Sequence, residues 1–188
     1  MKKLVIKTVA ITLAILIAIS ACFYLILSTF FPSVLGNGYF KVNNGELSLK
    51  YSEKAYENSG EIVDLATLVE RSIVFQDDDR TVKYAVLLIN DGKYQDYLSS
   101  ESDGYHYYIV GNLCEAQYNK GDKLVAISTA FNNTLEYTAH NPVHRLILLS
   151  AQNSDYLSLT AIKEYLQNRQ DKNQLINQHL ALIEELIN

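Results

Sequence analysis

One long uncharged run near the N-terminus constrains the fold of this chain more than any other feature. Lys7 is the last charged residue before Lys41, and the run from Thr8 to Phe31 is almost entirely apolar. At roughly 1.5 Å per residue, a helix through this run rises about 36 Å, which exceeds the roughly 30 Å hydrocarbon core of a bilayer. The run therefore predicts one membrane-spanning helix through residues 8–31, and residues 1–31 are predicted to be a short stub followed by an anchor.

The charges that flank this run predict its orientation. Lys2, Lys3 and Lys7 precede it, so the positive-inside rule places the N-terminus in the cytoplasm and the C-terminal part of the chain outside the plasma membrane. Two alternatives remain open. A cleaved signal peptide starts in the same way but usually has a shorter apolar region, and Ile19-Ser20-Ala21-Cys22 resembles the lipobox of bacterial lipoproteins. All three place the rest of the chain at the outer membrane surface.

The remainder of the chain is acidic. All 21 acidic residues follow the apolar run, with 13 of the 16 lysines and arginines, so the formal charge of this part is −8. Such a charge disfavours nucleic-acid binding. Cys22 would lie in the bilayer, which excludes a disulfide within the outer domain, and Cys114 is predicted to be a small buried residue. We expect a linker at 32–45 and one extracytoplasmic domain at 46–188.

Apolar residues at spacings of three and four predict helices from Leu47 onward. One amphipathic helix is predicted around residues 63–73 and a terminal capping helix at 173–188. Asp77-Asp78-Asp79 precede an expected helix from Arg80 to Ile89 and suit an N-cap with favourable helix-dipole charge. Asn141-Pro142 suit an N-cap and a first helical position.

Four turns in this region resemble one another. Their third positions, where a left-handed residue would fit, are Gly60, Gly92, Gly121 and Ser154. These positions recur at nearly equal intervals, a regularity that is typical of stacked helical hairpins. The predicted fold is therefore all-α, with an N-terminal transmembrane helix followed by an α-solenoid of about four hairpins.

The segment from Leu113-Cys114 through Tyr118-Asn119-Lys120-Gly121-Asp122 to Ala126 and Ala130 resembles a tetratricopeptide-type repeat. Tyr84-Ala85 before Asn90-Asp91-Gly92 repeats its large-small pair. The resemblance implies that the first helix of each hairpin lines a concave face that binds proteins or peptides. It would expose Lys50, Lys54, Glu57, Tyr108, Glu115, Tyr118 and His144, which are the candidate partner-binding residues.

The sequence favours binding over catalysis. His140 and His144 have a spacing that could suit a metal, but Pro142 separates them, and we predict neither a metal site nor a cofactor. The motifs of common hydrolases and nucleotide-binding proteins are absent from the sequence, so we do not expect an enzyme.

The 14 tyrosines instead suggest recognition of a protein or peptide at the outer membrane surface. We place function on the side of the 105–119 helix that carries Tyr108, Glu115 and Tyr118. The open alternatives are a module that binds cell-wall glycan and an enzyme whose site is not recognised.

Overall fold

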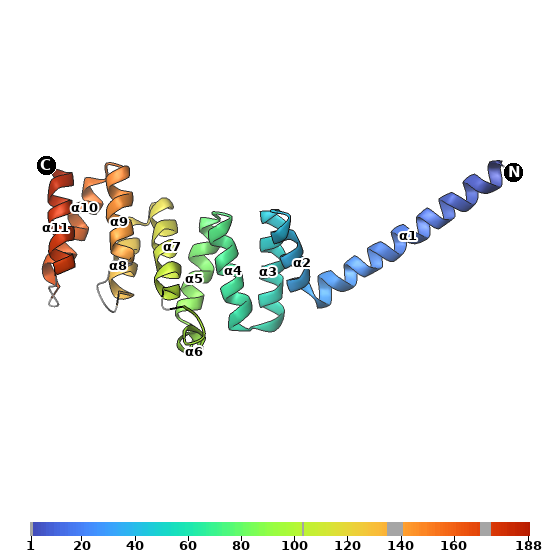
Figure 1. Ribbon diagram of the computed structural model, residues 1–188, viewed down its shortest axis with the longest axis horizontal. Helices are drawn as coiled ribbons and strands as arrows, with labels where there is room; N and C mark the ends of the chain where they lie inside the picture. Colours follow the sequence, from blue (N-terminus) through green and yellow to red (C-terminus); the bar gives the residue numbers. More distant parts are fainter. Residues whose placement is uncertain (1, 103, 135–140, 170–173) are drawn as a thin grey trace. The chain divides into compact units, whose positions relative to one another are not determined.

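The computed structural model describes residues 2–102, 104–134, 141–169 and 174–188, and every regular element in these ranges is a helix (Figure 1). The helices are α1 Lys2–Phe30, α2 Pro32–Lys41, α3 Gly45–Ser59, α4 Ile62–Val74, α5 Asp78–Ile89, α6 Tyr94–Leu98, α7 Tyr105–Asn119, α8 Lys123–Asn132, α9 Pro142–Gln152, α10 Tyr156–Asn168 and α11 Gln174–Ile187. The chain divides into two compact units, residues 1–71 and 72–188, with the boundary inside α4.

The apolar run forms α1, as predicted. Residues Ile6–Phe30 are long and apolar enough to cross a membrane, and none of their most apolar stretch is buried by the rest of the chain. A water-soluble helix of this composition would bury a stripe of side chains against a core. From Ile6 to Phe30 the side chains are exposed, except for Leu27 and Ser28, which are half-buried.

The segment at 32–45, expected to be a linker, is helical over most of its length. Pro32 occupies the first position of α2, and Asn44 caps α3 by accepting a hydrogen bond from the Leu47 amide at 3.2 Å. α2 packs directly on α3. The Ser48 hydroxyl donates to the Gly36 carbonyl at 3.2 Å, and both residues are buried. Tertiary packing thus stabilises a helix that two internal glycines disfavour.

A buried arginine joins α4 to this hairpin. The Arg71 side chain donates to Asn37 on α2 and to the Ser52 hydroxyl on α3 at 2.5 Å, and it lies 5.3 Å from the centre of the Phe40 ring. Burial lowers the pKa of this guanidinium, although its ordinary value is so high that the group stays charged. Gly36 leaves the space that the guanidinium fills, since a Cβ there would lie 2.7 Å from Nη1.

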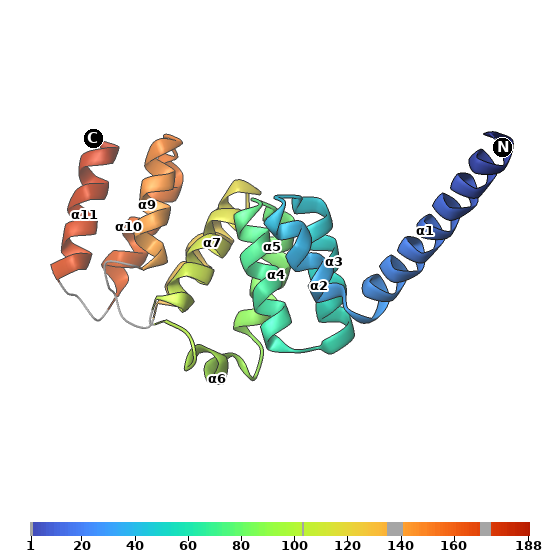
Figure 2. The ribbon, with the colours of Figure 1, turned by 45° about the vertical axis from the view of Figure 1, so that its right-hand side comes forward.

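Unit 72–188 is built from helices that contact their neighbours in two rows. α7 packs on α9 and α9 on α11 (Figure 2). α8 packs on α10, and the rows are joined by the pairs α7 with α8, α9 with α10 and α10 with α11. The core lies between the rows. Its buried residues are Val110, Cys114, Tyr118, Ala126, Ile127, Ala130, Val143, Leu146, Ile147, Leu159, Ile162, Leu166, Ile176 and Ile183.

Four inter-helix turns share one geometry. A residue with positive φ is followed at once by the N-cap of the next helix, at Asn43-Asn44, Gln76-Asp77, Gly121-Asp122 and Ser154-Asp155. In each, the N-cap amide donates to a carbonyl five positions earlier, which satisfies the end of the preceding helix. The interval from position 43 to 76 equals that from 121 to 154, whereas the interval between 76 and 121 is longer.

The structure confirms part of the predicted turn series and corrects the rest. Gly60 and Gly121 have φ values of +63° and +91°, and Ser154 has +53°. Gly92 does not have positive φ, and the five-residue α6 follows it instead of a long second helix.

α6 lies within the longer middle interval between the turns. Tyr94 anchors it, because this side chain is 1% exposed and its hydroxyl lies 3.2 Å from His106 Nδ1. His106 Nε2 in turn lies 3.1 Å from the Asn133 carbonyl oxygen, which joins α6 and α7 to the end of α8. Burial raises the pKa of Tyr94 to about 12, so this phenol stays protonated.

The turn geometry gives a first prediction. Replacing Gly121 by alanine should destabilise the chain by roughly 1 kcal/mol or more, because φ of +91° is strained for any residue with a Cβ. The matched control is Gly92→Ala. Neither site has an atom within 4 Å of the added Cβ, so only φ distinguishes them. Urea unfolding of the full chain in detergent micelles measures both variants, and equal losses would contradict the prediction.

Candidate functional site

One side of α7 lines two cavities within unit 72–188. The first has a volume of about 520 Å³ and is lined by Gly104, Tyr107, Tyr108, Gly111, Asn141, Pro142 and Arg145. The second, of about 320 Å³, is lined by Ile73, Gln76, Asp78, Thr81, Asn112, Glu115, Ala116, Asn119 and Arg145. The α7 residues of the two sets occupy successive turns of the helix. We call the two cavities together the α7 groove.

Arg145, on α9, lines both parts of the groove. Its guanidinium pairs with Glu115 on α7, and the two side chains are 46% and 35% exposed. Gly111 lies next to this arginine, and a Cβ at position 111 would be in van der Waals contact with Arg145 Nη1, at 3.5 Å. The pair is accessible to solvent, so each partner can exchange its ion pair for a contact with a ligand at small cost.

The groove offers several kinds of contact. Tyr108 is 41% exposed, and its ring lies 6.5 Å from that of Tyr105 beneath it. Glu115 and Asp78 supply acceptors, Asn112 supplies an amide, and Arg145 supplies donors. Aromatic, amide and charged groups along about 20 Å of one helix suit an extended polar chain better than a compact apolar ligand.

The seven predicted site residues are divided between the two units. Lys50, Lys54 and Glu57 lie on α3 in the first unit, where Lys54 is half-buried and the other two are exposed. Tyr108, Glu115, Tyr118 and His144 lie in the second unit. Of these four, only Tyr108 and Glu115 line the α7 groove.

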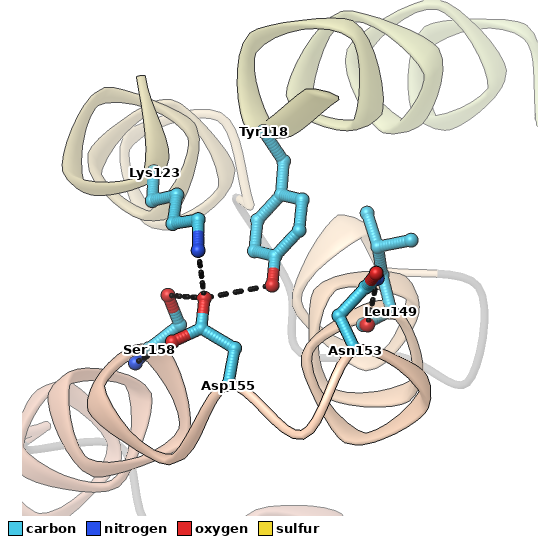
Figure 3. A network of polar contacts seen from close by, with 6 residues as sticks. All are labelled: Tyr118, Lys123, Leu149, Asn153, Asp155 and Ser158. Atoms are coloured by element: carbon cyan, nitrogen blue, oxygen red, sulfur yellow. Dashed lines mark hydrogen bonds and ion pairs between the residues drawn. The ribbon is translucent and has the colours of Figure 1, made fainter. Parts of the chain in front are cut away.

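Tyr118 is a core residue, which corrects the expectation that it is exposed beside Tyr108. It is 5% exposed, and its hydroxyl donates to Asp155 Oδ2 at 2.7 Å (Figure 3). At about 100° per residue, Tyr118 lies about 80° around the helix from Tyr108. Because α5, α8 and α9 all pack on α7, only a narrow stripe stays accessible, and Tyr118 falls outside it.

Asp155 joins the hairpin of α7 and α8 to that of α9 and α10. Besides Tyr118, it accepts from Lys123 Nζ at 2.7 Å, the Ser158 hydroxyl at 2.8 Å and the Ser158 amide at 3.2 Å (Figure 3). Burial raises the pKa of this carboxyl, but the hydrogen bonds from Lys123, Tyr118 and Ser158 lower it more. The pKa of Asp155 therefore lies well below its usual range. The Asp155 carboxylate thus stays charged and holds the two hairpins together.

His144 pairs with another histidine. Its ring stacks on that of His179 from α11, with centroids 4.8 Å apart, and His144 Nδ1 lies 2.9 Å from His179 Nε2. Burial, and next the charge of His144, lower the pKa of His179 to about 4. His140 lies outside the described residues. Within the residues that the structure describes, no three side chains of metal-binding type come together.

Sequence reasoning missed Arg145, Asp155 and His179. A lone arginine within an apolar helix gives no sign of its partner, so Arg145 could not be found from the sequence. Asp155 follows the predicted turn at Ser154, and its capping role could have been inferred there. Cys114 is as predicted: it is 1% exposed, and burial raises the pKa of its thiol to about 12, which leaves a poor nucleophile.

Comparisons of the chain with protein-family models, with curated proteins and with solved structures found no match.

Proposed function

We propose that this chain is a single-pass plasma-membrane protein whose extracytoplasmic domain binds an extended segment of another protein in the α7 groove. The groove is the observation that carries the proposal. It places an accessible tyrosine, amide groups and Glu115 along α7, with Arg145 of α9 in an exchangeable ion pair with Glu115. Side chains of these kinds recognise both the backbone and the charges of a peptide.

The membrane part of the proposal rests on α1 and its flanking charges. A helix from Ile6 to Phe30 with no buried side chains in its most apolar stretch needs an apolar solvent. Lysines precede it and the acidic domain follows, so the N-terminus is cytoplasmic and the domain lies outside. Anchoring concentrates the groove near partners at the same surface.

The fold part of the proposal is an α-solenoid of helical hairpins. Its support is the turn geometry shared by positions 43, 76, 121 and 154 and the two-row packing of α7 to α11. The intervals 43–76 and 121–154, on either side of α6, are equal and fit a repeated unit. Tetratricopeptide-type proteins, which the sequence resembles, use this architecture for peptide binding, and no catalytic arrangement is part of the proposal.

The test is a binding measurement with one paired control. The full chain in nanodiscs is screened against an immobilised peptide library, and the affinity of the best binder is then measured in solution. Arg145→Ala should weaken binding about tenfold, which is about 1.4 kcal/mol. The control, Lys163→Ala, removes the comparably exposed Lys163–Glu184 pair outside the groove and should leave binding unchanged.

Measuring stability alongside binding distinguishes the loss of a peptide contact from the loss of folded protein. Both variants lose one exposed ion pair, so their free energies of unfolding should drop by under about 1 kcal/mol each. Equal peptide affinity for wild type and Arg145→Ala, or a chain that binds no peptide, would contradict the proposal. Binding of wall-glycan fragments that is lost in the same variant would assign the groove to glycan instead.

A further inference from the structure

Exposed apolar side chains lie on α2 and at both of its caps, immediately after the proposed membrane span. Phe31, Val34 and Val42 are 53%, 53% and 71% exposed. Val34 and the C-cap Val42 are eight positions apart, so at about 100° per residue they lie about 80° apart around the helix axis, and Phe31 is the N-cap that joins α2 to α1. Pro32 and Gly36, which are buried against the rest of the unit, lie on the other side. The exposed side chains thus belong to a helix whose inner side packs on α3.

Three tyrosines fix this hairpin to the outer part of α1. The Tyr24 hydroxyl on α1 is hydrogen-bonded to the Tyr51 hydroxyl on α3, and their rings meet edge to face with centroids 6.4 Å apart. Tyr51 also stacks on Tyr39 of α2, with centroids 5.7 Å apart and planes 9° from parallel. Nearer the end of α1, the side-chain amide of Asn58 donates from Nδ2 to the Thr29 carbonyl at 3.3 Å. The hairpin therefore packs beside the last turns of α1.

The length of α1 determines the depth of this contact. The 25 residues from Ile6 to Phe30 rise about 37 Å, roughly 7 Å more than the hydrocarbon core. Tyr24 precedes Phe30 by about 9 Å along the helix axis, and so lies close to the boundary between acyl chains and headgroups. Tyrosine is enriched at this level of membrane proteins. A hairpin attached at Tyr24 must share the headgroup layer.

We propose that the hairpin of α2 and α3 lies in the headgroup layer of the outer leaflet, with Phe31, Val34 and Val42 in contact with lipid. This inference rests on the proposed membrane span. The partner is the bilayer itself, because these side chains continue directly from the apolar surface of α1 and lie at the depth that Tyr24 sets. Lys41, exposed at the end of α2, can reach headgroup phosphates while its methylene groups follow the apolar surface.

The test uses tryptophan as a depth reporter, since the natural chain contains no tryptophan. Single variants Val34→Trp and Val42→Trp of the full chain are reconstituted in phosphatidylcholine–phosphatidylglycerol vesicles, with and without bromine on the acyl chains. Leu16→Trp, inside the span, serves as the reference for insertion. Leu157→Trp, at an 86% exposed position in the second unit, is the reference for a water-exposed site.

We expect brominated lipid to quench Leu16→Trp most strongly, Val34→Trp and Val42→Trp clearly, and Leu157→Trp not at all. Emission at positions 34 and 42 should also be shifted to the blue relative to position 157. If positions 34 and 42 behave like position 157 while position 16 is quenched, the hairpin is in water and the inference is wrong, although the anchor stands. If position 16 is not quenched, the proposed membrane span is wrong and the inference is overturned with it.

Discussion

Replacement of Asp155 by alanine is expected to lower the free energy of unfolding by about 3 kcal/mol, because the variant loses the N-cap of α10 and leaves the largely buried Tyr118 hydroxyl without its acceptor. The carboxylate accepts from Tyr118, Lys123 and two groups of Ser158, and its side chain is only 10% exposed. Urea unfolding of the full chain in detergent micelles measures the loss.

Asp122→Ala is the matched control, because Asp122 occupies the same place after a positive-φ residue but makes no side-chain cap hydrogen bond. It should change the free energy of unfolding by under about 0.5 kcal/mol. The effect at Asp155 should also depend on pH. Since the folded chain lowers the pKa of this carboxyl, its contribution is complete above the unfolded value of about 3.9 and disappears as the pH falls below it. A loss of the same size in both variants would contradict the assigned role.

Acidification from pH 7.5 to pH 5 should destabilise the chain by about 2 kcal/mol through His179 alone. The unfolded histidine takes up a proton near pH 6.5, whereas burial lowers the pKa of the folded one to about 4. Between these values the unfolded state binds more protons, so stability falls as the pH falls. Urea unfolding of the full chain at the two pH values measures the change.

His179→Leu is the control for this effect. The side chain is 5% exposed and packs between α11 and α9, so leucine can fill the site without a titrating group. The variant should lose most of the pH dependence in this window, whatever its stability at pH 7.5. A variant that keeps the wild-type slope would show that other groups cause the destabilisation.

Features set by short-range interactions were predictable from the sequence. The hydropathy of residues 8–31 predicts α1 because a long run of apolar side chains is by itself enough to favour a helix in an apolar environment. The N-cap expected within Asp77-Asp78-Asp79, which is Asp77, the cap at Asn141 and the positive φ at Gly121 depend on atoms within a few residues of each position. The helices around 63–73 and 173–188 follow from apolar periodicity and occur as α4 and α11.

Other features were decided only by contacts between distant segments. The sequence of α2 has two glycines and is typical of a linker, but packing against Ser48 and Arg71 makes it a helix. Gly92 resembles the other turns, yet the burial of Tyr94 against His106 forms α6 there. A local pattern cannot predict such outcomes, because their energy comes from groups far away along the chain.

The candidate site shows the same division within a single helix. Sequence alone determined that 105–119 is helical and that Tyr108 and Glu115 share a side, because helical periodicity relates them. Tertiary structure decided which part of that helix is open: α5, α8 and α9 pack on α7, and in this packing Tyr118 is buried whereas Tyr108 stays accessible. It also brought Arg145 to Glu115 and Asp155 to Tyr118 from separate helical hairpins. Periodicity determines the relative positions of side chains around a helix, whereas packing by neighbouring helices determines which of those positions face solvent.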